Sequence, residues 1–463
     1  MTQIDPTPTA DSAQTEAARP LWRVFLVFLV PMVVSNILQA LSGTLNGVFI
    51  GQMLGTHALA AVSGMFPIIF FFVSLVIGVG AGASVLIGQA WGAREGQKVK
   101  AIAGTALALG LGLGLLVALF GGMFAEELLR LLGTPPDVLQ DAIHYARTMM
   151  LAMPLLLVFI LQTQLMRGVG DTLTPLYALL LSTCVSCLLT PAFIRGWGGL
   201  PQLGVTSAAA ASICSNLISL TFLAWFMRRR KHALAPDAQL LRALRIDPAI
   251  LKLVVKIGLP TGVQMITISL AEIVLLSLVN GFGSNATAAY GAVNQVVNYV
   301  QFPALSIAIT ASILGAQAIG SGRADTLKAI ARTGLKLNLI LTGSLVVIGY
   351  LFSRQFIGLF ITSAPVVELA QTLLHIMLWS SVIFGFSAVL GGVMRASGSV
   401  LVPTGISIFC IAAIEVPSAW FLSHHFGING VWMAYPITFL SMLAMQASYY
   451  QWVWRKKKVV RLV

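Results

Sequence analysis

The sequence predicts an all-α membrane protein with twelve transmembrane helices in two parallel six-helix lobes, related by a pseudo-twofold axis along the membrane normal. Three observations predict this fold. The chain of 463 residues is 57% hydrophobic and only 9% charged, which is far more apolar than a soluble protein of this length requires. Its apolar runs are long enough to cross a bilayer, and the same motifs occur twice along the chain.

The twelve expected spans come from the apolar runs between loops. A transmembrane helix needs roughly 20 consecutive apolar residues, because the hydrocarbon core is about 30 Å thick. The runs that meet this length, allowing some residues of uncertainty at each end, are 22–50, 56–91, 95–124, 137–166, 172–195, 203–227, 250–281, 285–317, 325–352, 364–394, 400–424 and 428–454.

The internal repeat has an offset of 228 residues. The matching pairs are Gln89-Ala90 with Gln317-Ala318, Lys100-Ala101-Ile102 with Lys328-Ala329-Ile330, and Met166-Arg167 with Met394-Arg395. Self-similarity of this kind indicates that each half is one copy of a single unit. Six spans per copy is an even number, so both copies enter the membrane with the same polarity.

The domain organisation follows from these spans. We expect a disordered cytoplasmic leader over 1–20, an N-terminal lobe over 21–228, a cytoplasmic interlobe linker over 229–249, a C-terminal lobe over 250–455 and a basic cytoplasmic tail over 456–463. The leader is polar and has no signal-peptide pattern. The Arg228–Lys231 run could bind anionic lipid, but we favour a stop signal that fixes the sixth span.

The net charge of +13 predicts membrane topology rather than binding of nucleic acid. With both termini in the cytoplasm, all but four of the 28 Lys and Arg residues fall on the cytoplasmic side, as the positive-inside rule requires. The four exceptions are Arg130, Arg147, Arg195 and Arg354. We therefore expect a multi-pass protein of a cell inner membrane. The four cysteines lie within apolar spans and show no disulfide or metal-site pattern.

Two carboxylates are expected near the middle of the membrane. Thirteen of the fifteen acidic residues lie in the leader, in loops or at span ends, which leaves Glu272 and Glu415. Each lies nine residues before the outer end of its span, or about 13 Å inward. An ionisable group at this depth is costly without a partner or a wet cavity, so it indicates function. Glu415 has an alternative role, because it could bond backbone groups freed by Pro417.

Polar and aromatic residues near these acids predict a central cavity. On the eighth span, Tyr290, Asn294, Asn298 and Gln301 recur at helical spacing and share one face. The corresponding positions of the first copy are apolar and include two phenylalanines. The predicted substrate-binding residues are Gln264, Tyr290, Asn294, Asn298, Gln301, Phe66, Phe70 and Asn46. The alternative is that the amides only hold helices together.

This combination of side chains suits an organic cation. A carboxylate supplies charge, and aromatic faces accept both a cation and flat apolar rings. Desolvation favours the protonated form of a carboxyl group, so such a group can exchange a proton for the substrate. We therefore predict that Glu272 and Glu415 couple transport to an ion.

Several motifs together resemble the multidrug and toxic compound extrusion (MATE) family, in its NorM-like bacterial branch. They are Gly51–Gly55 (GQMLG) with Ala58–Ala61, Gln89–Gly92 (QAWG), Met166–Thr172 (MRGVGDT), Gly258–Pro260 with Glu272, and Met394–Gly398 (MRASG). The resemblance implies twelve helices in two six-helix lobes and a secondary antiporter, and we expect a monomer without a cofactor. Such a protein exports cationic or amphipathic small molecules in exchange for protons or sodium by alternating access.

Within this resemblance, the ion-coupling role carries over to Glu272 alone. Asn46 replaces an acid that many relatives carry, and Phe384-Gly385 stands where relatives often have an aspartate. A sodium site built from several carboxylates is therefore not expected, and we favour protons over sodium as the coupling ion.

Three other functions compete with cation export. A flippase for a lipid-linked precursor, of the same superfamily, would need a basic cavity, whereas the charged residues at membrane depth are acidic. A major facilitator would carry an Asp-Arg-Gly-Arg pattern in the loop at 92–100, which is absent. An intramembrane enzyme would need clustered acids or a metal set, and no DxxxD or DDxxD motif is present. We therefore expect no catalytic residues.

Overall fold

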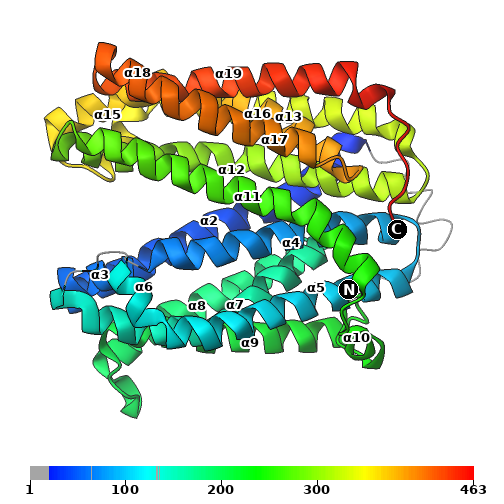
Figure 1. Ribbon diagram of the computed structural model, residues 1–463, viewed down its shortest axis with the longest axis horizontal. Helices are drawn as coiled ribbons and strands as arrows, with labels where there is room; N and C mark the ends of the chain where they lie inside the picture. The colour runs from blue at the N-terminus through cyan, green and yellow to red at the C-terminus, as the bar shows by residue number, and fades with distance from the viewer. Residues whose placement is uncertain (1–19, 64, 132–133, 135) are drawn as a thin grey trace. The chain divides into compact units, whose positions relative to one another are not determined.

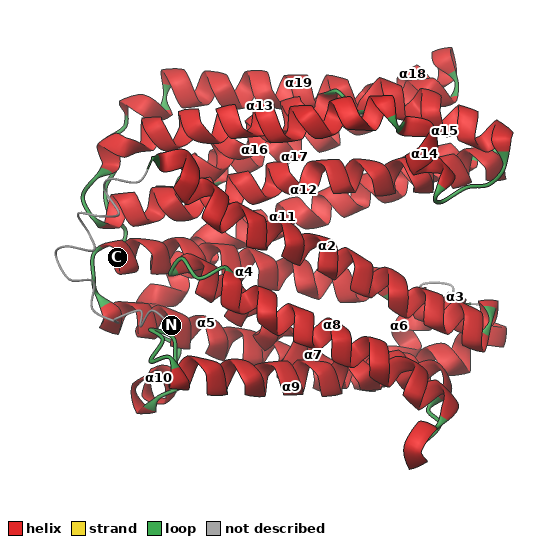
Figure 2. Cartoon of the chain, turned by 180° about the vertical axis from the view of Figure 1, so that it is seen from behind, coloured by secondary structure: helices red, strands yellow, loops and turns green. Residues whose placement is uncertain are grey.

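The computed structural model describes residues 20–63, 65–131, 134 and 136–463. In this part of the chain, all regular secondary structure is helical, loops connect the helices, and no strand is present (Figure 2). The all-α prediction is confirmed. Residues 1–19, which make up nearly all of the expected leader, lie outside the described residues.

Contacts divide the described chain into two compact units. The first unit contains Val34–Trp91 and Glu95–Leu259, and the second contains residues 20–33, Gly92–Arg94 and Pro260–Val463. The division runs through two long helices, α2 (Leu21–Leu54) and α11 (Pro248–Asn280), rather than through loops. It falls at Pro260 and within three residues of Pro31, where proline removes a helical hydrogen bond.

The first unit is built around α7. Besides parts of α2 and α11, it contains the helices α3 (Thr56–Ser63), α4 (Phe66–Gly92), α5 (Gly96–Leu116), α6 (Ala125–Leu131), α7 (Pro136–Gly168), α8 (Leu173–Arg195), α9 (Ser207–Arg229) and α10 (Ala238–Ala243). Helix α7 packs against α5 and α9, and α8 packs against α9 (Figure 1). Fully buried side chains of α7, such as Met153 and Leu157, form the centre of its core.

The second unit is built around α12 (Ser284–Gly320). Its further helices are α13 (Leu327–Leu351), α14 (Ser353–Gly358), α15 (Ala364–Met377), α16 (Ser380–Ala396), α17 (Leu401–Phe409), α18 (Val416–Phe426) and α19 (Ile428–Trp452). Helix α12 packs against α13, α15 and α16, and α19 packs against α16 and α18 (Figure 1). Trp432, which is completely buried, lies in its core.

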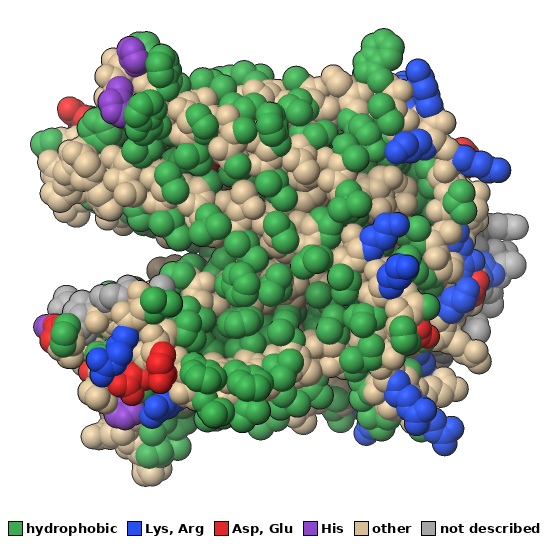
Figure 3. Space-filling model, in the orientation of Figure 1, with side chains coloured by type: hydrophobic (Ala, Val, Ile, Leu, Met, Phe, Trp, Pro, Cys, Tyr) green, Lys and Arg blue, Asp and Glu red, His purple; other side chains and the backbone are tan. Residues whose placement is uncertain are grey.

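The predicted spans agree with the helices in place and number. Eleven helices of the described chain are long and apolar enough to cross a membrane, and a twelfth span results when α15 and α16 are counted together. These two helices are bent by 43° at their junction, so the expected span over 364–394 consists of two helices rather than one. On the face shown in Figure 3, charged side chains gather near the helix ends, and hydrophobic side chains cover the segments between.

Two spans contain a π-helical segment. One is η1 (Val117–Gly121), which continues α5, and the other is η5 (Cys410–Glu415), which joins α17 to α18. Single-turn π segments within α-helices are rare, and where they occur they are often found at functional sites.

The expected linker is folded rather than extended. Asp237 caps α10 by accepting a hydrogen bond of 2.8 Å from the backbone N–H of Leu240, and it forms an ion pair with Lys100 of α5. A Cβ atom on Gly104 would lie 2.0 Å from the carbonyl oxygen of Ala243, so only glycine permits this approach of α5 to the linker. Residues 229–249 therefore pack against the first unit.

Candidate functional site in the second unit

Glu415 ends the π-helical segment η5. Pro417 follows two residues later in the first turn of α18. Because proline has no N–H group, the carbonyl four residues earlier, that of Ala413, loses its α-helical partner. The wider π turn and the proline together explain why the backbone is irregular at this position. The neighbourhood of Pro417 was expected from the sequence, but the π geometry was not.

The surroundings of Glu415 are apolar. Its side chain is only 6% exposed. Its chain neighbours Ile414 and Val416 pack against a small core formed by Ala271, Cys410, Ile411 and Met442. Among the described residues, no Lys, Arg or His nitrogen lies within 4.0 Å of the Glu415 or Glu272 carboxylate. A buried charge without a counter-ion is costly. No basic side chain of the described structure offsets this cost for a charged Glu415, as a structural ion pair would.

Glu272 of α11 completes an acidic pair with Glu415. Its side chain is exposed, and the two carboxyl groups repel each other electrostatically. Both carboxyl groups also interact electrostatically with the hydroxyl groups of Tyr290 and Tyr435. Glu272 therefore lies near enough to α12, η5 and α19 to belong to one polar cluster with them.

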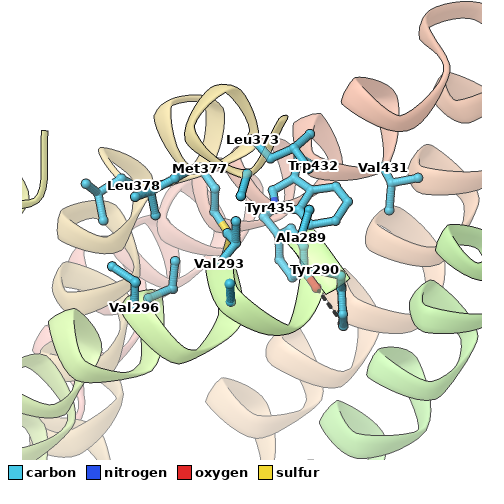
Figure 4. Packing of buried hydrophobic residues seen from close by; sticks show 14 of the residues in the cluster. Ala289, Tyr290, Val293, Val296, Leu373, Met377, Leu378, Val431, Trp432 and Tyr435 are labelled. Atoms are coloured by element: carbon cyan, nitrogen blue, oxygen red, sulfur yellow. Dashed lines mark hydrogen bonds between the residues drawn. The ribbon is translucent and has the colours of Figure 1, made fainter. Parts of the chain in front are cut away.

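Tyr290 and Tyr435 form the neutral part of this cluster. Their hydroxyl oxygens are 3.4 Å apart, and either group can act as the donor (Figure 4). Asn294 lies one turn further along α12, close to the Tyr290 hydroxyl. Trp432 packs edge-on against Tyr290, with ring centroids 5.3 Å apart and an interplanar angle of 77°. Its indole nitrogen is buried and has no hydrogen-bond partner in the described structure.

The other predicted polar residues of this unit lie on α11 and α12. Gln264, Asn294 and Gln301 are half-buried, and Asn298 is exposed. Tyr290 is buried at 6% exposure. Electrostatic interactions thus join the two acids and Tyr290, with Asn294 close by, whereas Asn298 and Gln301 only continue along the same helix.

The three predicted residues of the first unit have different surroundings. The Asn46 amide donates to the Ser186 hydroxyl at 3.3 Å, and its carbonyl accepts from Thr190 at 3.1 Å. These bonds fix α2 to α8. Phe66 and Phe70 stack on each other with centroids 5.8 Å apart, and Phe66 is 64% exposed.

Sequence reasoning missed Tyr435 and Trp432 of α19. A signal was present, since Trp432, Tyr435 and Phe439 recur at helical spacing in the twelfth span. Such an aromatic stripe is common in helix cores, so the spacing alone does not distinguish a site. Only the approach of α19 to α12 joins the two tyrosines.

Sequence reasoning also missed Asn338 of α13, which is completely buried. Its amide donates to the Val382 carbonyl at 3.0 Å, and its side-chain oxygen accepts from Thr342 at 2.9 Å. A Cβ atom at Gly385 would lie 2.0 Å from this oxygen. Asn338 thus occupies the space beside the glycine at which relatives were expected to carry an aspartate.

No metal centre accompanies the acidic pair. Over the part of the chain that the structure describes, no group of three or more His, Cys, Asp or Glu side chains could hold a metal ion. The carboxyl, hydroxyl and amide groups of the cluster can bind protons, form hydrogen bonds and attract a cation.

Comparison with known proteins identifies the family of the chain. A model of the MatE family matches residues 31–192 and 260–421, two segments of equal length that begin at Pro31 and Pro260. The chain belongs to the MatE family. This double match also confirms the internal repeat.

MATE relatives and structures cover nearly the whole chain. It is 43% identical over 452 residues to the probable multidrug resistance protein YoeA of Bacillus subtilis, covering 97% of this chain and 98% of that protein. It is 25% identical over 420 residues to the multidrug export protein MepA of Staphylococcus aureus, covering 89% of each. A mutant of the Vibrio cholerae MATE transporter VcmN matches with a TM-score of 0.88 at 21% identity, covering 96% of this chain and 99% of that one, which shows the fold.

These findings establish the class of protein. The chain is a multi-pass membrane transporter of the MATE multidrug efflux family and is not an enzyme. The family expected from the sequence motifs is therefore confirmed.

Proposed function

We propose that this MATE protein is a secondary active antiporter that exports organic cations and amphipathic drugs in exchange for protons by alternating access. The observation that carries the proposal is the pair Glu272 and Glu415. The Glu415 carboxyl group is buried, the Glu272 carboxyl group repels it, and no basic side chain lies within 4.0 Å of either in the described structure. A proton or a cationic substrate can supply the missing positive charge.

Competition between the proton and the substrate produces exchange. Two interacting carboxyl groups lose their protons as a pair in two steps, because the second negative charge forms beside the first. A cation that approaches the pair favours proton release, and a proton that returns favours release of the cation. The hydroxyl groups of Tyr290 and Tyr435 can donate to a carboxylate, which stabilises the deprotonated state.

The energetics limit what one proton can achieve. Exchange of one proton for one monovalent cation moves no net charge, so the membrane potential contributes nothing. Each pH unit then supplies about 1.4 kcal/mol, or tenfold accumulation. With a second proton, one net charge crosses the membrane in each cycle, so the membrane potential contributes a further driving force of about 2.3 kcal/mol per 100 mV.

We infer that the first unit does not exchange the ion. Asn46 is a neutral amide whose two ends are both bonded, to Ser186 and Thr190. Sodium remains the alternative coupling ion, because carboxylate, hydroxyl and amide oxygens of the cluster are ligands for hard cations. The experiment must therefore separate the two ions.

The test is transport of ethidium, a fluorescent monovalent cation, by purified protein in vesicles. A pH gradient and a sodium gradient are imposed separately. We expect the pH gradient alone to drive uptake, and Glu272→Gln and Glu415→Gln to abolish it. Glu368→Gln is the matched control, because Glu368 is exposed in the first turns of α15.

Three results would contradict the proposal. Transport driven only by sodium would exclude proton exchange. Normal pH-driven transport in both glutamine variants would exclude the acidic pair as the coupling site. Failure of the Glu368→Gln control would show that any loss of carboxylate disables the protein without specificity.

A further inference from the structure

A groove follows the last two turns of α9. The described residues that line it all belong to α9, so the groove is the open side of one helix rather than an enclosed cavity; they are Thr221, Ala224, Trp225, Arg228 and Arg229. Their spacing places them on one side of the helix. Helix α9 packs against α7 and α8, whereas Thr221, Trp225, Arg228 and Arg229 are exposed, so this side of the helix is open. Helix α10, which follows the groove residues in the chain, is labelled beside this end of α9 in Figure 1.

The two arginines of the groove are held in place by protein contacts. The Nε atom of Arg228 donates to the Pro236 carbonyl at 2.8 Å. The Arg229 guanidinium lies 5.4 Å from the centroid of the Trp225 ring. Within the described structure, neither arginine forms an ion pair with an acidic side chain. Arg228 thus retains four N–H donors on its terminal nitrogens for a ligand.

An apolar strip runs from the groove toward the middle of α9. Trp225 is 54% exposed, and Leu217 and Ile218 are 52% and 42% exposed. From Arg228 to Leu217 the helix rises about 16 Å at 1.5 Å per residue. This is about half of a hydrocarbon core of roughly 30 Å, so the strip spans one leaflet.

We propose that this groove binds an anionic phospholipid. The phosphate lies between Arg228 and Arg229, Trp225 packs at the level of the glycerol backbone, and an acyl chain follows Ile218 and Leu217. Arginine is suited to phosphate because its planar fork donates two parallel hydrogen bonds. Tryptophan is enriched at membrane interfaces because its ring is apolar at one end and polar at the other.

Position in the membrane agrees with an anionic lipid. Arg230 and Lys231 follow the groove residues, and the Arg230 guanidinium lies 4.5 Å from the centroid of the Phe226 ring. The distribution of charge predicts that this end of α9 is cytoplasmic, and anionic lipids attract basic clusters next to a transmembrane helix. A stop signal alone requires only the positive charges. It does not require an open groove, fixed guanidinium groups or an apolar strip.

The test measures the thermal unfolding of the purified full chain in a neutral detergent. Phosphatidylglycerol is added at increasing ratio, and phosphatidylcholine and inorganic phosphate are added in parallel samples. We expect the unfolding midpoint to rise by several degrees with phosphatidylglycerol only, since a ligand that binds the native state stabilises it. Native mass spectrometry on the same samples should show a retained phosphatidylglycerol molecule.

The variants separate this groove from general basic charge. Arg228→Gln/Arg229→Gln should remove both the rise in the midpoint and the retained lipid. Lys456→Gln/Lys457→Gln is the matched control, because these two lysines lie 5.8 and 5.6 Å from the ring centroids of Trp452 and Tyr449 at the end of α19. This control should keep both effects.

Each other outcome would overturn the proposal. An equal effect of phosphatidylcholine would show that charge is not recognised, and an equal effect of inorganic phosphate would show a site for a free anion. A full phosphatidylglycerol effect in the Arg228→Gln/Arg229→Gln protein would place the lipid elsewhere. If the arginine variant unfolds too early to measure, Trp225→Leu replaces it, and an unchanged response in that variant contradicts the proposal equally.

Discussion

The hydroxyl oxygens of Tyr290 and Tyr435 lie 3.4 Å apart, although the two residues are separated by 145 positions in the chain. This pair lies where α12 and α19 meet, and both hydroxyls interact electrostatically with Glu272 and Glu415. Phenol hydroxyls can donate and accept hydrogen bonds. The tyrosine pair thus lies close enough to the two acids to be affected by their charge.

Removal of the Tyr435 hydroxyl should weaken ion coupling more than stability. A hydrogen bond contributes about 1 kcal/mol, so Tyr435→Phe should cost no more than about this free energy of unfolding and keep the ring packing. We expect pH-driven ethidium transport to fall by about threefold to tenfold, because the acidic pair loses a donor. Transport assays and thermal unfolding check this prediction. The same loss in Tyr299→Phe, a half-exposed tyrosine of α12 away from the pair, would argue against a specific role.

Binding of a cation should strengthen as pH rises. Deprotonation of the acidic pair provides the negative charge that holds the cation, so low pH opposes binding. If one proton leaves for each cation, the Kd falls up to tenfold per pH unit, about 1.4 kcal/mol, over the range in which the pair titrates. Titration of ethidium fluorescence at several pH values measures the slope. In Glu272→Gln/Glu415→Gln the affinity should be weak and independent of pH, and a slope retained there would contradict the assignment.

Gly385 should tolerate a side chain only when Asn338 is shortened. A Cβ atom at Gly385 would lie 2.0 Å from the Asn338 side-chain oxygen, and overpacking of a core typically costs about 1–3 kcal/mol. We expect Gly385→Ala to lower the unfolding midpoint. In a protein that already carries Asn338→Ala, Gly385→Ala should lower the free energy of unfolding by less than it does in the wild-type background. Additive effects in this double-mutant cycle would refute direct contact.

The docked linker should open in acid. The Lys100 hydrogen bond holds the pKa of Asp237 below its usual range. A depressed folded pKa gives a stabilisation that is present above the unfolded pKa, near 3.9, and is lost as pH falls through the folded pKa. Because Asp237 is 43% exposed, the ion pair itself contributes at most about 1 kcal/mol.

Loss of the Asp237 cap should have the same effect at neutral pH. Asp237→Ala removes the cap of α10, at a cost of about 1 kcal/mol. We expect faster trypsin cleavage after Arg242 and Arg245 in this variant, measured by limited proteolysis at about neutral pH. Asp247→Ala is the comparison variant that removes a different acid of the linker, since Asp247 makes no contact with Lys100 among the described residues. Equal cleavage of wild type and Asp237→Ala would show that the cap does not hold the linker.

Much of the site could be predicted from the sequence because burial in a membrane is a local property of composition. Glu272 and Glu415 were identified simply as acids within apolar spans, and Tyr290 and Asn294 followed from helical spacing. Tyr435 could not be found in this way, because an aromatic residue in an apolar span is typical of a helix core. Asn338 was missed for a similar reason, since its role depends on a glycine 47 positions later.

The sequence by itself determined the helices, the apolar spans and the twofold repeat, and it singled out Glu272 and Glu415 as acids within apolar spans, because hydropathy and helical periodicity act over one or two turns. Only the tertiary structure decided that Glu415 ends a π turn, that Tyr435 meets Tyr290, that the tenth span bends and that the linker docks on α5. These features depend on contacts between helices that are far apart along the chain, and a pattern of neighbouring residues does not encode which side chains meet across such a contact.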